Sequence, residues 1–245
     1  MIKEIILAII QGVTEFLPIS SSGHLALFSN FFSEVNLSLF VYLHFASLLA
    51  VVIFLRKKIK DLFLKRRKYF LFVLFGIIPA VFIGFLFRDL IERTFSSLLF
   101  LGLCFLISSI FLFLTKFQKK EISLNYMNSF LIGLFQILSL FPGISRSGIT
   151  ISSARILGVK KEEAFDFSFL MFIPLVIGAS FLEIFDKKDF FFSINFIIPF
   201  ILCFFISYFS LAILNQLLKE NNLWLFGFYC LFLGFLCIIL FLLNM

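Results

Sequence analysis

The sequence predicts an all-α protein that crosses a membrane several times. Of its 245 residues, 62% are hydrophobic and only 14% are charged, and the mean hydropathy is +1.13. A water-soluble domain cannot cover its outside with so few polar residues, so the chain is expected in a lipid bilayer. Two further observations define the architecture: six long apolar segments, and two shorter apolar segments that end in clusters of polar residues.

Six apolar segments are long enough to cross the hydrocarbon core, which needs about 17 to 25 helical residues. The predicted spans are 38–55, 69–87, 95–115, 164–184, 192–218 and 223–244. They are expected to form one integral membrane domain over residues 1–245.

Two other apolar runs are too short to cross. The run 5–19 would be about 22 Å long as a helix, and it reaches Pro18 before the polar "SSSGH" and a short "LALFSNFF". The run 130–144 reaches Pro142 before "SRSG". Short apolar pieces around a polar break predict a re-entrant helical hairpin, which dips into the bilayer and returns to the same face.

The charges of the loops predict the orientation. Residues 56–68 contain eight basic residues and one acidic residue, which puts this loop in the cytoplasm. Counting from there, 116–121 and 160–163 are also cytoplasmic, while 88–93 and 186–189 lie outside. The two hairpins then enter from opposite faces, and both termini lie outside.

Each half of the chain therefore reads as a hairpin followed by three spans, in opposite orientations. Repeat one covers about 1–115 and repeat two about 122–245, and "QGVTEFLPISSSG" is weakly similar to "QILSLFPGISRSG". Inverted repeats bring broken helices together near the bilayer midplane. The polar residues would then line a shared cavity instead of contacting lipid.

The formal charge of +7 does not point to nucleic acid as a partner. The basic residues lie between apolar segments, as the positive-inside rule predicts, and no nucleic-acid-binding motif is present. The four cysteines lie in apolar segments without metal-ligand spacing and are expected to pack. A homodimer is compatible with the sequence, although no dimerisation motif is sustained through a span.

Gln11 and Glu15 are the first candidate site residues. They are four residues apart, which places both on one helical face. A carboxylate inside a membrane is costly and usually marks a function. The alternative is that Glu15 pairs with Arg146 only to hold the hairpins together.

Both polar breaks are predicted to begin a helix with serines. Amide N–H groups, hydroxyls and the positive end of a helix dipole can hold an anion. Arg146 adds a guanidinium group, which can bind a phosphate or carboxylate through two parallel hydrogen bonds. Two such loops predict a site for an anion with several charged groups, such as a diphosphate. The alternative is that the serines are ordinary N-caps. The residues predicted to bind are Gln11, Ser20, Ser21, Ser22, Gly23, Gly143, Ser145, Arg146, Ser147 and Gly148.

His24 follows the first serine cluster. It is a candidate proton donor or nucleophile, with a polar cap as the alternative. His44, in the first span, is expected to be structural, held by a neighbour one turn away or by water. Arg155 is expected near the cytoplasmic interface and outside the site.

The motifs "QGVTEFLPISSSGHL" and "PGISRSG" resemble those of the undecaprenyl-diphosphate phosphatase family, whose members confer bacitracin resistance. The likeness extends through "GIIPAVFIG" at 76–84 and "FSFLMFIPLVIGAS" at 167–180, and so covers nearly the whole chain. Many members have glutamate at the position of Gln11, so this chain has one carboxylate fewer there.

The resemblance implies a bacterial inner-membrane enzyme that converts undecaprenyl diphosphate into the monophosphate carrier lipid for cell-wall synthesis. It also implies a site open to the extracytoplasmic side and a divalent cation, Mg²⁺ or Ca²⁺. The family's functional residues fall on Glu15, Ser21, Ser22, His24, Ser145 and Arg146. Of these, Glu15, Ser22, His24 and Arg146 would be catalytic, and Glu15 would hold the metal or activate water.

One rival function comes from a different class. Inverted repeats with helices broken at the midplane are also typical of secondary transporters and lipid flippases, and the same anion site would suit an anionic cargo. Composition and topology alone leave this alternative open. In the enzyme interpretation, the prenyl chain would lie in a groove between apolar spans.

Overall fold

The computed structural model describes residues 2–29, 37–64, 67–94, 97–118, 120–186 and 194–243. These residues form helices, and their one β-type pairing is an isolated bridge between Ile122 and Val159. The α-helices are α1 (Ile2–Thr14), α2 (Ser21–Ser29), α3 (Leu37–Phe54), α4 (Arg56–Leu64), α5 (Arg67–Leu86), α6 (Arg88–Arg93), α7 (Leu98–Leu114), α8 (Tyr126–Gln136), α9 (Arg146–Ile156), α10 (Lys161–Asp186), α11 (Ile197–Lys219) and α12 (Leu225–Leu242).

The all-α membrane architecture is confirmed. In the described part of the chain, α5, α7, α10, α11 and α12 lie within segments long and apolar enough to cross a bilayer. The sixth predicted span falls on α3, which passes the same test together with α4, from which it is bent by 74°. A re-entrant hairpin is one that returns to the bilayer face from which it entered. This description of the two short hairpins stays a prediction.

Large apolar side chains cover the outside of the spanning helices. Phe82 and Phe85 on α5 are 63% and 77% exposed, and Phe232 on α12 is 64% exposed. Surfaces of this kind are stable in lipid and not in water. Polar side chains are instead turned inward, toward the two short hairpins.

The first hairpin differs from the prediction in one respect. A helical run was expected over 5–19, but α1 ends at Thr14 and residues 15–19 form turns. The ring of Pro18 is incompatible with a helical carbonyl four residues earlier, and it pushes the preceding residue out of the helical region. Glu15 therefore lies at the end of the helix, although its N–H still donates to the Gln11 carbonyl at 2.9 Å.

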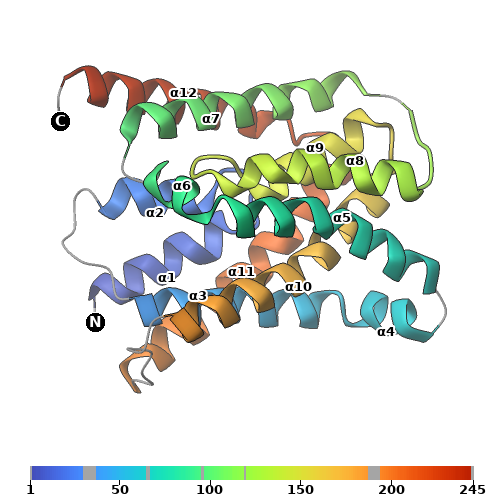
Figure 1. Cartoon of the computed structure of the whole chain (residues 1–245), viewed down its shortest axis with the longest axis horizontal. Helices are drawn as coiled ribbons and strands as arrows, with labels where there is room; N and C mark the ends of the chain where they lie inside the picture. The colour runs from blue at the N-terminus through green and yellow to red at the C-terminus, as the bar shows by residue number, and fades with distance from the viewer. Residues whose placement is uncertain are drawn as a thin grey trace.

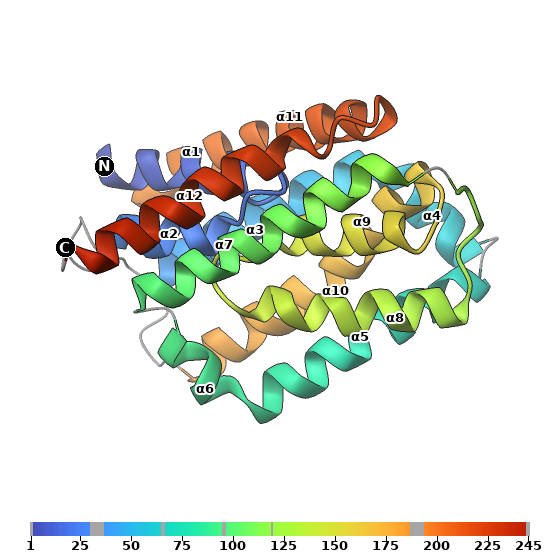
Figure 2. The same ribbon diagram turned by 90° about the horizontal axis from the view of Figure 1, so that it is seen from above.

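The polar turns of the two hairpins meet inside the bundle. Figures 1 and 2 show α1 and α2 in the half of the molecule that carries the termini, and α8 in the half that carries α4. Helices α7 and α12 lie side by side in both views, because Gly102 and Gly234 allow close approach: a Cβ on Gly102 would lie 2.8 Å from the Gly234 carbonyl oxygen. Buried Phe169 and Phe172 of α10 meet Phe16 of the first turn edge-on.

Candidate active site

The polar turns of the two hairpins touch each other. A Cβ on Gly23 would lie 2.9 Å from the Cα of Gly143, and a Cβ on Gly148 would lie 3.2 Å from the Cβ of Pro18. When the two turns are aligned without gaps from their glutamines, Gly23 corresponds to Gly148 and Pro18 to Gly143. The contacts are therefore reciprocal, as two-fold-related repeats require.

The two turns also share one hydrogen-bond pattern. Ser20 accepts from the Gly23 N–H at 3.2 Å and Ser145 from the Gly148 N–H at 3.1 Å, each through its side-chain oxygen. Each of these N-cap hydroxyls also pairs with a serine two residues later, Ser22 or Ser147. The N-cap interpretation is therefore right for Ser20 and Ser145, whose contact with a substrate stays a prediction.

The first helical residue of each hairpin's second helix points to Glu15. Arg146 Nη2 lies 3.2 Å from Glu15 Oε1, and the Ser21 hydroxyl donates to Oε2 at 2.6 Å. Gln11, one turn earlier on α1, donates to the same Oε2 at 2.9 Å. The predicted common face of Gln11 and Glu15 is thus confirmed, and one carboxylate joins both turns.

The Glu15–Arg146 pair is largely removed from solvent. The side chains of Arg146 and Glu15 are 16% and 8% exposed. The guanidinium also stacks over Phe172 of α10, with its Cζ 3.9 Å from the ring centroid. Arg146 Nη1 is buried with no hydrogen-bond partner, so a strong donor is left for a further oxygen next to the carboxylate.

Two neighbouring spanning helices, α7 and α12, each contact one of the turns. The Ser108 hydroxyl on α7 donates to the Gly143 carbonyl at 3.1 Å and accepts from the Ser145 N–H at 3.3 Å. On α12, the Cys230 thiol contacts the Pro18 carbonyl at 3.5 Å. The turn of each repeat is therefore held by a helix of the other repeat, which makes the site rigid without tying up Arg146.

His24 has a separate set of partners. Its Nδ1 lies 2.7 Å from the Ser20 carbonyl, and its Nε2 lies 2.7 Å from the Tyr229 hydroxyl of α12. The two rings are stacked at 5.7 Å, while Phe105 meets the imidazole edge-on. A carbonyl can only accept, so we assign the proton of the neutral ring to Nδ1, and Nε2 accepts from Tyr229.

An apolar cavity of about 680 Å³ begins at His24 and Tyr229. It lies between α1, α11 and α12 and reaches Leu217, Asn222 and Leu225 near the α11–α12 connection. The prediction of a groove between apolar spans is consistent with this cavity, whose histidine end adjoins the serine turn.

The structure brings most of the predicted residues together. Gln11, Ser21, Glu15 and Arg146 form one contact network, and the turn glycines pack against one another. The ring of His24 lies apart from this network: its nitrogens contact the Ser20 carbonyl and the Tyr229 hydroxyl, and Phe105 meets it edge-on.

The two residues expected outside the site have structural partners. His44 Nδ1 lies 2.9 Å from the Phe40 carbonyl, one turn away. Arg155 is 3% exposed and contacts Glu121 and the Val159 carbonyl. Neither contacts Glu15 or Arg146.

Sequence reasoning missed two residues of the site, and it did not single out Gln136 of the second hairpin. Tyr229 and Phe172 lie in apolar helices where an aromatic residue is ordinary, so no sequence pattern singled them out. Gln136 was detectable, because it aligns with Gln11 in the internal repeat. Its side chain is buried, and neither amide atom has a hydrogen-bond partner.

A divalent cation fits this site in a limited way. Among the described residues, no group of three His, Cys, Asp or Glu side chains could hold a metal ion. Glu15 is the one acidic side chain in the network, but the Oε1 of Gln11 beside it is buried without a partner. A carboxylate and a neutral oxygen suit Mg²⁺ or Ca²⁺ when substrate phosphates supply other ligands.

Comparison with known proteins agrees with this geometry. Residues 4–236 match the family model of the bacitracin resistance protein BacA. The chain is 41% identical to the undecaprenyl-diphosphatase of Thermosipho africanus, over 95% of this chain and 97% of the relative. It is 39% identical to that of Methanococcus vannielii, with 93% and 95% coverage, and 40% identical to that of Thermosipho melanesiensis, with 97% and 98% coverage. A match over nearly the full length places this chain in the bacitracin resistance protein BacA family.

Proposed function

We propose that this membrane protein hydrolyses undecaprenyl diphosphate to undecaprenyl phosphate and inorganic phosphate. One observation carries the proposal: two helix-initiating turns from different parts of the chain converge on Glu15 and leave a buried donor of Arg146 without a partner. The names of the full-length relatives support the same reaction. The product would serve as recycled carrier lipid for cell-wall synthesis, and its regeneration would confer bacitracin resistance.

Arg146 is proposed to bind the terminal phosphate. Its free Nη1 would donate to a phosphoryl oxygen, while Glu15 and Phe172 hold the guanidinium in place. Donors fixed before the reaction stabilise charge that develops on the transferred phosphoryl group. Ser22 and Ser147, at corresponding positions of the two turns, are proposed to supply further hydroxyl contacts.

His24 is proposed to act through Nε2. The Ser20 carbonyl holds the proton on Nδ1, so Nε2 carries the lone pair. In the nucleophilic role, Nε2 would bond to the terminal phosphorus as the bond to the lipid monophosphate breaks, and water would then hydrolyse the phosphohistidine to inorganic phosphate. Once protonated, the same atom could donate a proton to the leaving lipid phosphate. Either role requires Nε2 to exchange its Tyr229 hydrogen bond for a substrate atom.

Glu15 and Gln11 are proposed to hold a divalent cation of the Mg²⁺ or Ca²⁺ type. The cation would offset negative charge on the diphosphate oxygens. Removal of the ion with a chelator should abolish turnover, and Gln11→Leu should raise the cation concentration needed for half-maximal activity. Unchanged turnover in chelator would exclude the ion.

The 680 Å³ cavity is proposed to hold the first isoprene units of the lipid. Most of its lining is apolar, and His24 and Tyr229 lie where it adjoins the serine turn. A prenyl chain seated there would bring the diphosphate next to the serine turns while its remaining length extends into the bilayer.

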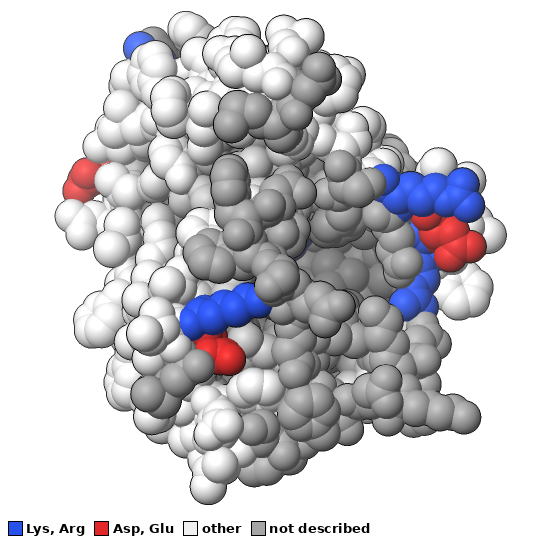
Figure 3. All heavy atoms as spheres, turned by 90° about the vertical axis from the view of Figure 1, so that its left-hand side faces the viewer, with Lys and Arg blue, Asp and Glu red and all other residues white. Residues whose placement is uncertain are grey.

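The protein is proposed to lie in a bacterial inner membrane, with the site open to the extracytoplasmic side. Figure 3 shows charged side chains of both signs, in places side by side, on the described part of the end that carries the termini, whereas the opposite end carries the basic helix α4. The four native cysteines are buried. An impermeant maleimide applied to intact cells should label Asp89→Cys and spare Lys60→Cys, and the reverse pattern would refute this orientation.

Release of inorganic phosphate by purified protein in detergent separates hydrolysis from transport, because no gradient exists there. The proposal predicts phosphate release from undecaprenyl diphosphate and its loss in Arg146→Lys. The control is Arg155→Lys. Arg155 is a buried arginine on the same helix, and it pairs with Glu121 instead of Glu15. Gradient-driven uptake into liposomes without phosphate release would instead support the transporter, which the names of the relatives do not favour.

A further inference from the structure

A cavity of about 470 Å³ lies at the end of the molecule opposite the termini, where α3, α4, α10 and α11 meet. Its lining combines basic side chains, among them Arg56, Lys57 and Lys219, with aromatic side chains. None of the residues that line it belongs to the Glu15–Arg146 network. The cavity is therefore a separate feature of the fold.

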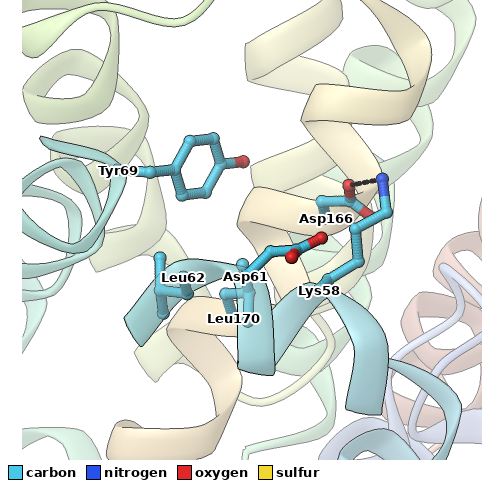
Figure 4. A pocket seen from close by; sticks show the side chains of 6 residues that line it. All are labelled: Lys58, Asp61, Leu62, Tyr69, Asp166 and Leu170. Atoms are coloured by element: carbon cyan, nitrogen blue, oxygen red, sulfur yellow. Dashed lines mark ion pairs between the residues drawn. The ribbon is translucent and has the colours of Figure 1, made fainter. Parts of the chain in front are cut away.

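The charge around this cavity is positive and only partly compensated. Four basic and two acidic residues line it, which gives a net formal charge of +2. Lys58 is already paired with Asp166 at 2.7 Å, and Figure 4 shows this pair bordering a smaller cavity that also contains Asp61. An anion would thus be met by Arg56, Lys57 and Lys219.

The other part of the lining is aromatic and lies close to the lipid-facing surface. The ring of Phe54 meets Tyr208 edge-on at 5.5 Å and Phe165 at 6.0 Å. Ile53, which also lines the cavity, is 37% exposed on the outside of α3. A free phosphate ion gains no binding energy from contact with aromatic side chains. The glycerol and first acyl carbons of a lipid can pack against them.

We propose that this cavity binds the headgroup of one anionic phospholipid. Its phosphate would lie among Arg56, Lys57 and Lys219, and the start of its acyl chains would lie along Phe54 and Tyr208. Basic pockets between spanning helices at a cytoplasmic face bind anionic headgroups in this way. The proposal does not depend on the reaction at Glu15.

Native mass spectrometry of the full chain in neutral detergent can measure lipid binding directly. The protein is titrated with phosphatidylglycerol and, in parallel, with phosphatidylcholine. The double variant R56Q/K57Q removes two charges from the cavity. The matched control K60Q/K120Q removes two charges at positions that do not line it. Thermal unfolding in the same detergent shows whether each variant is folded.

We expect one phosphatidylglycerol to bind at least about tenfold more tightly than phosphatidylcholine, with the preference lost in R56Q/K57Q and kept in K60Q/K120Q. Equal binding of the two lipids, or equal losses in both double variants, would overturn the proposal. Displacement of the lipid by millimolar inorganic phosphate would overturn the choice of a lipid. Tighter binding of a polyprenyl monophosphate than of phosphatidylglycerol would assign the site to another class of lipid.

Discussion

Arg146 and Glu15 show how far single residues could be predicted. In a chain this apolar, the carboxylate and the arginine of the two polar turns had to lie away from lipid. Their pairing was predictable, because burying either charge alone is costly. The partners of His24 could not be predicted in the same way. Tyr229 is 205 residues away, and nothing in the apolar sequence of α12 distinguishes it from its aromatic neighbours.

Tyr229→Phe tests whether the tyrosine hydroxyl competes with the substrate for His24 Nε2. The change removes the hydroxyl that donates to Nε2 and keeps the stacked ring. A hydrogen bond of this kind contributes about 0.5–1.5 kcal/mol. Because Nε2 must give up this bond to react, kcat should rise by up to about tenfold while KM changes little. Steady-state kinetics with Tyr126→Phe as the control decide the matter. A change in KM alone would show that the hydroxyl only contacts the lipid.

At the scale of elements, the sequence predicted six spans and two interrupted hairpins, and the helices lie where expected. Two boundaries were not predicted. Helix α1 ends at Thr14 because Pro18 acts through the residues before it, and α3 bends by 74° into α4 at Leu55 without a proline or glycine to signal it. The end of α1 has a local signal in Pro18, but the bend at Leu55 has none in the local sequence.

Gly143→Ala tests the geometry of the second turn. Gly143 has φ +94°, and a Cβ there would lie 2.8 Å from the Leu101 carbonyl oxygen. The combined strain should lower the free energy of unfolding by at least about 2 kcal/mol. The control Gly178→Ala lies in a helix with no atom within 4 Å of the new Cβ, and it should stabilise the protein by about 0.5–1 kcal/mol. Chemical unfolding in detergent compares the free energies of unfolding of the two variants. Similar changes in both variants would contradict the turn geometry.

Leu217→Trp tests the apolar cavity as the site of the prenyl chain. The larger side chain would fill the end remote from His24. We expect KM to rise severalfold for undecaprenyl diphosphate and to change little for a short-chain prenyl diphosphate. Ile213→Trp, on an exposed position of the same helix, is the control. Equal effects on long and short substrates would place the chain elsewhere.

At the scale of the whole molecule, the inverted repeat was the most productive prediction. An inverted repeat would account for the reciprocal contacts of Gly23 and Gly148, and for the contact that α7 and α12 each make with the turn of the other half. The repeat itself, its boundaries and the homodimer stay predictions. The basic cavity at α4 could not be foreseen, because it joins four helices that are distant in sequence.

A double-mutant cycle on Glu15 and Arg146 tests the central claim most directly. If both residues serve one phosphoryl-transfer site, Glu15→Gln and Arg146→Lys should each reduce kcat for phosphate release by at least about 100-fold. The double variant should then be little worse than the poorer single variant. Losses that multiply, or normal turnover in either single variant, would show that this carboxylate and this arginine do not act together on the diphosphate.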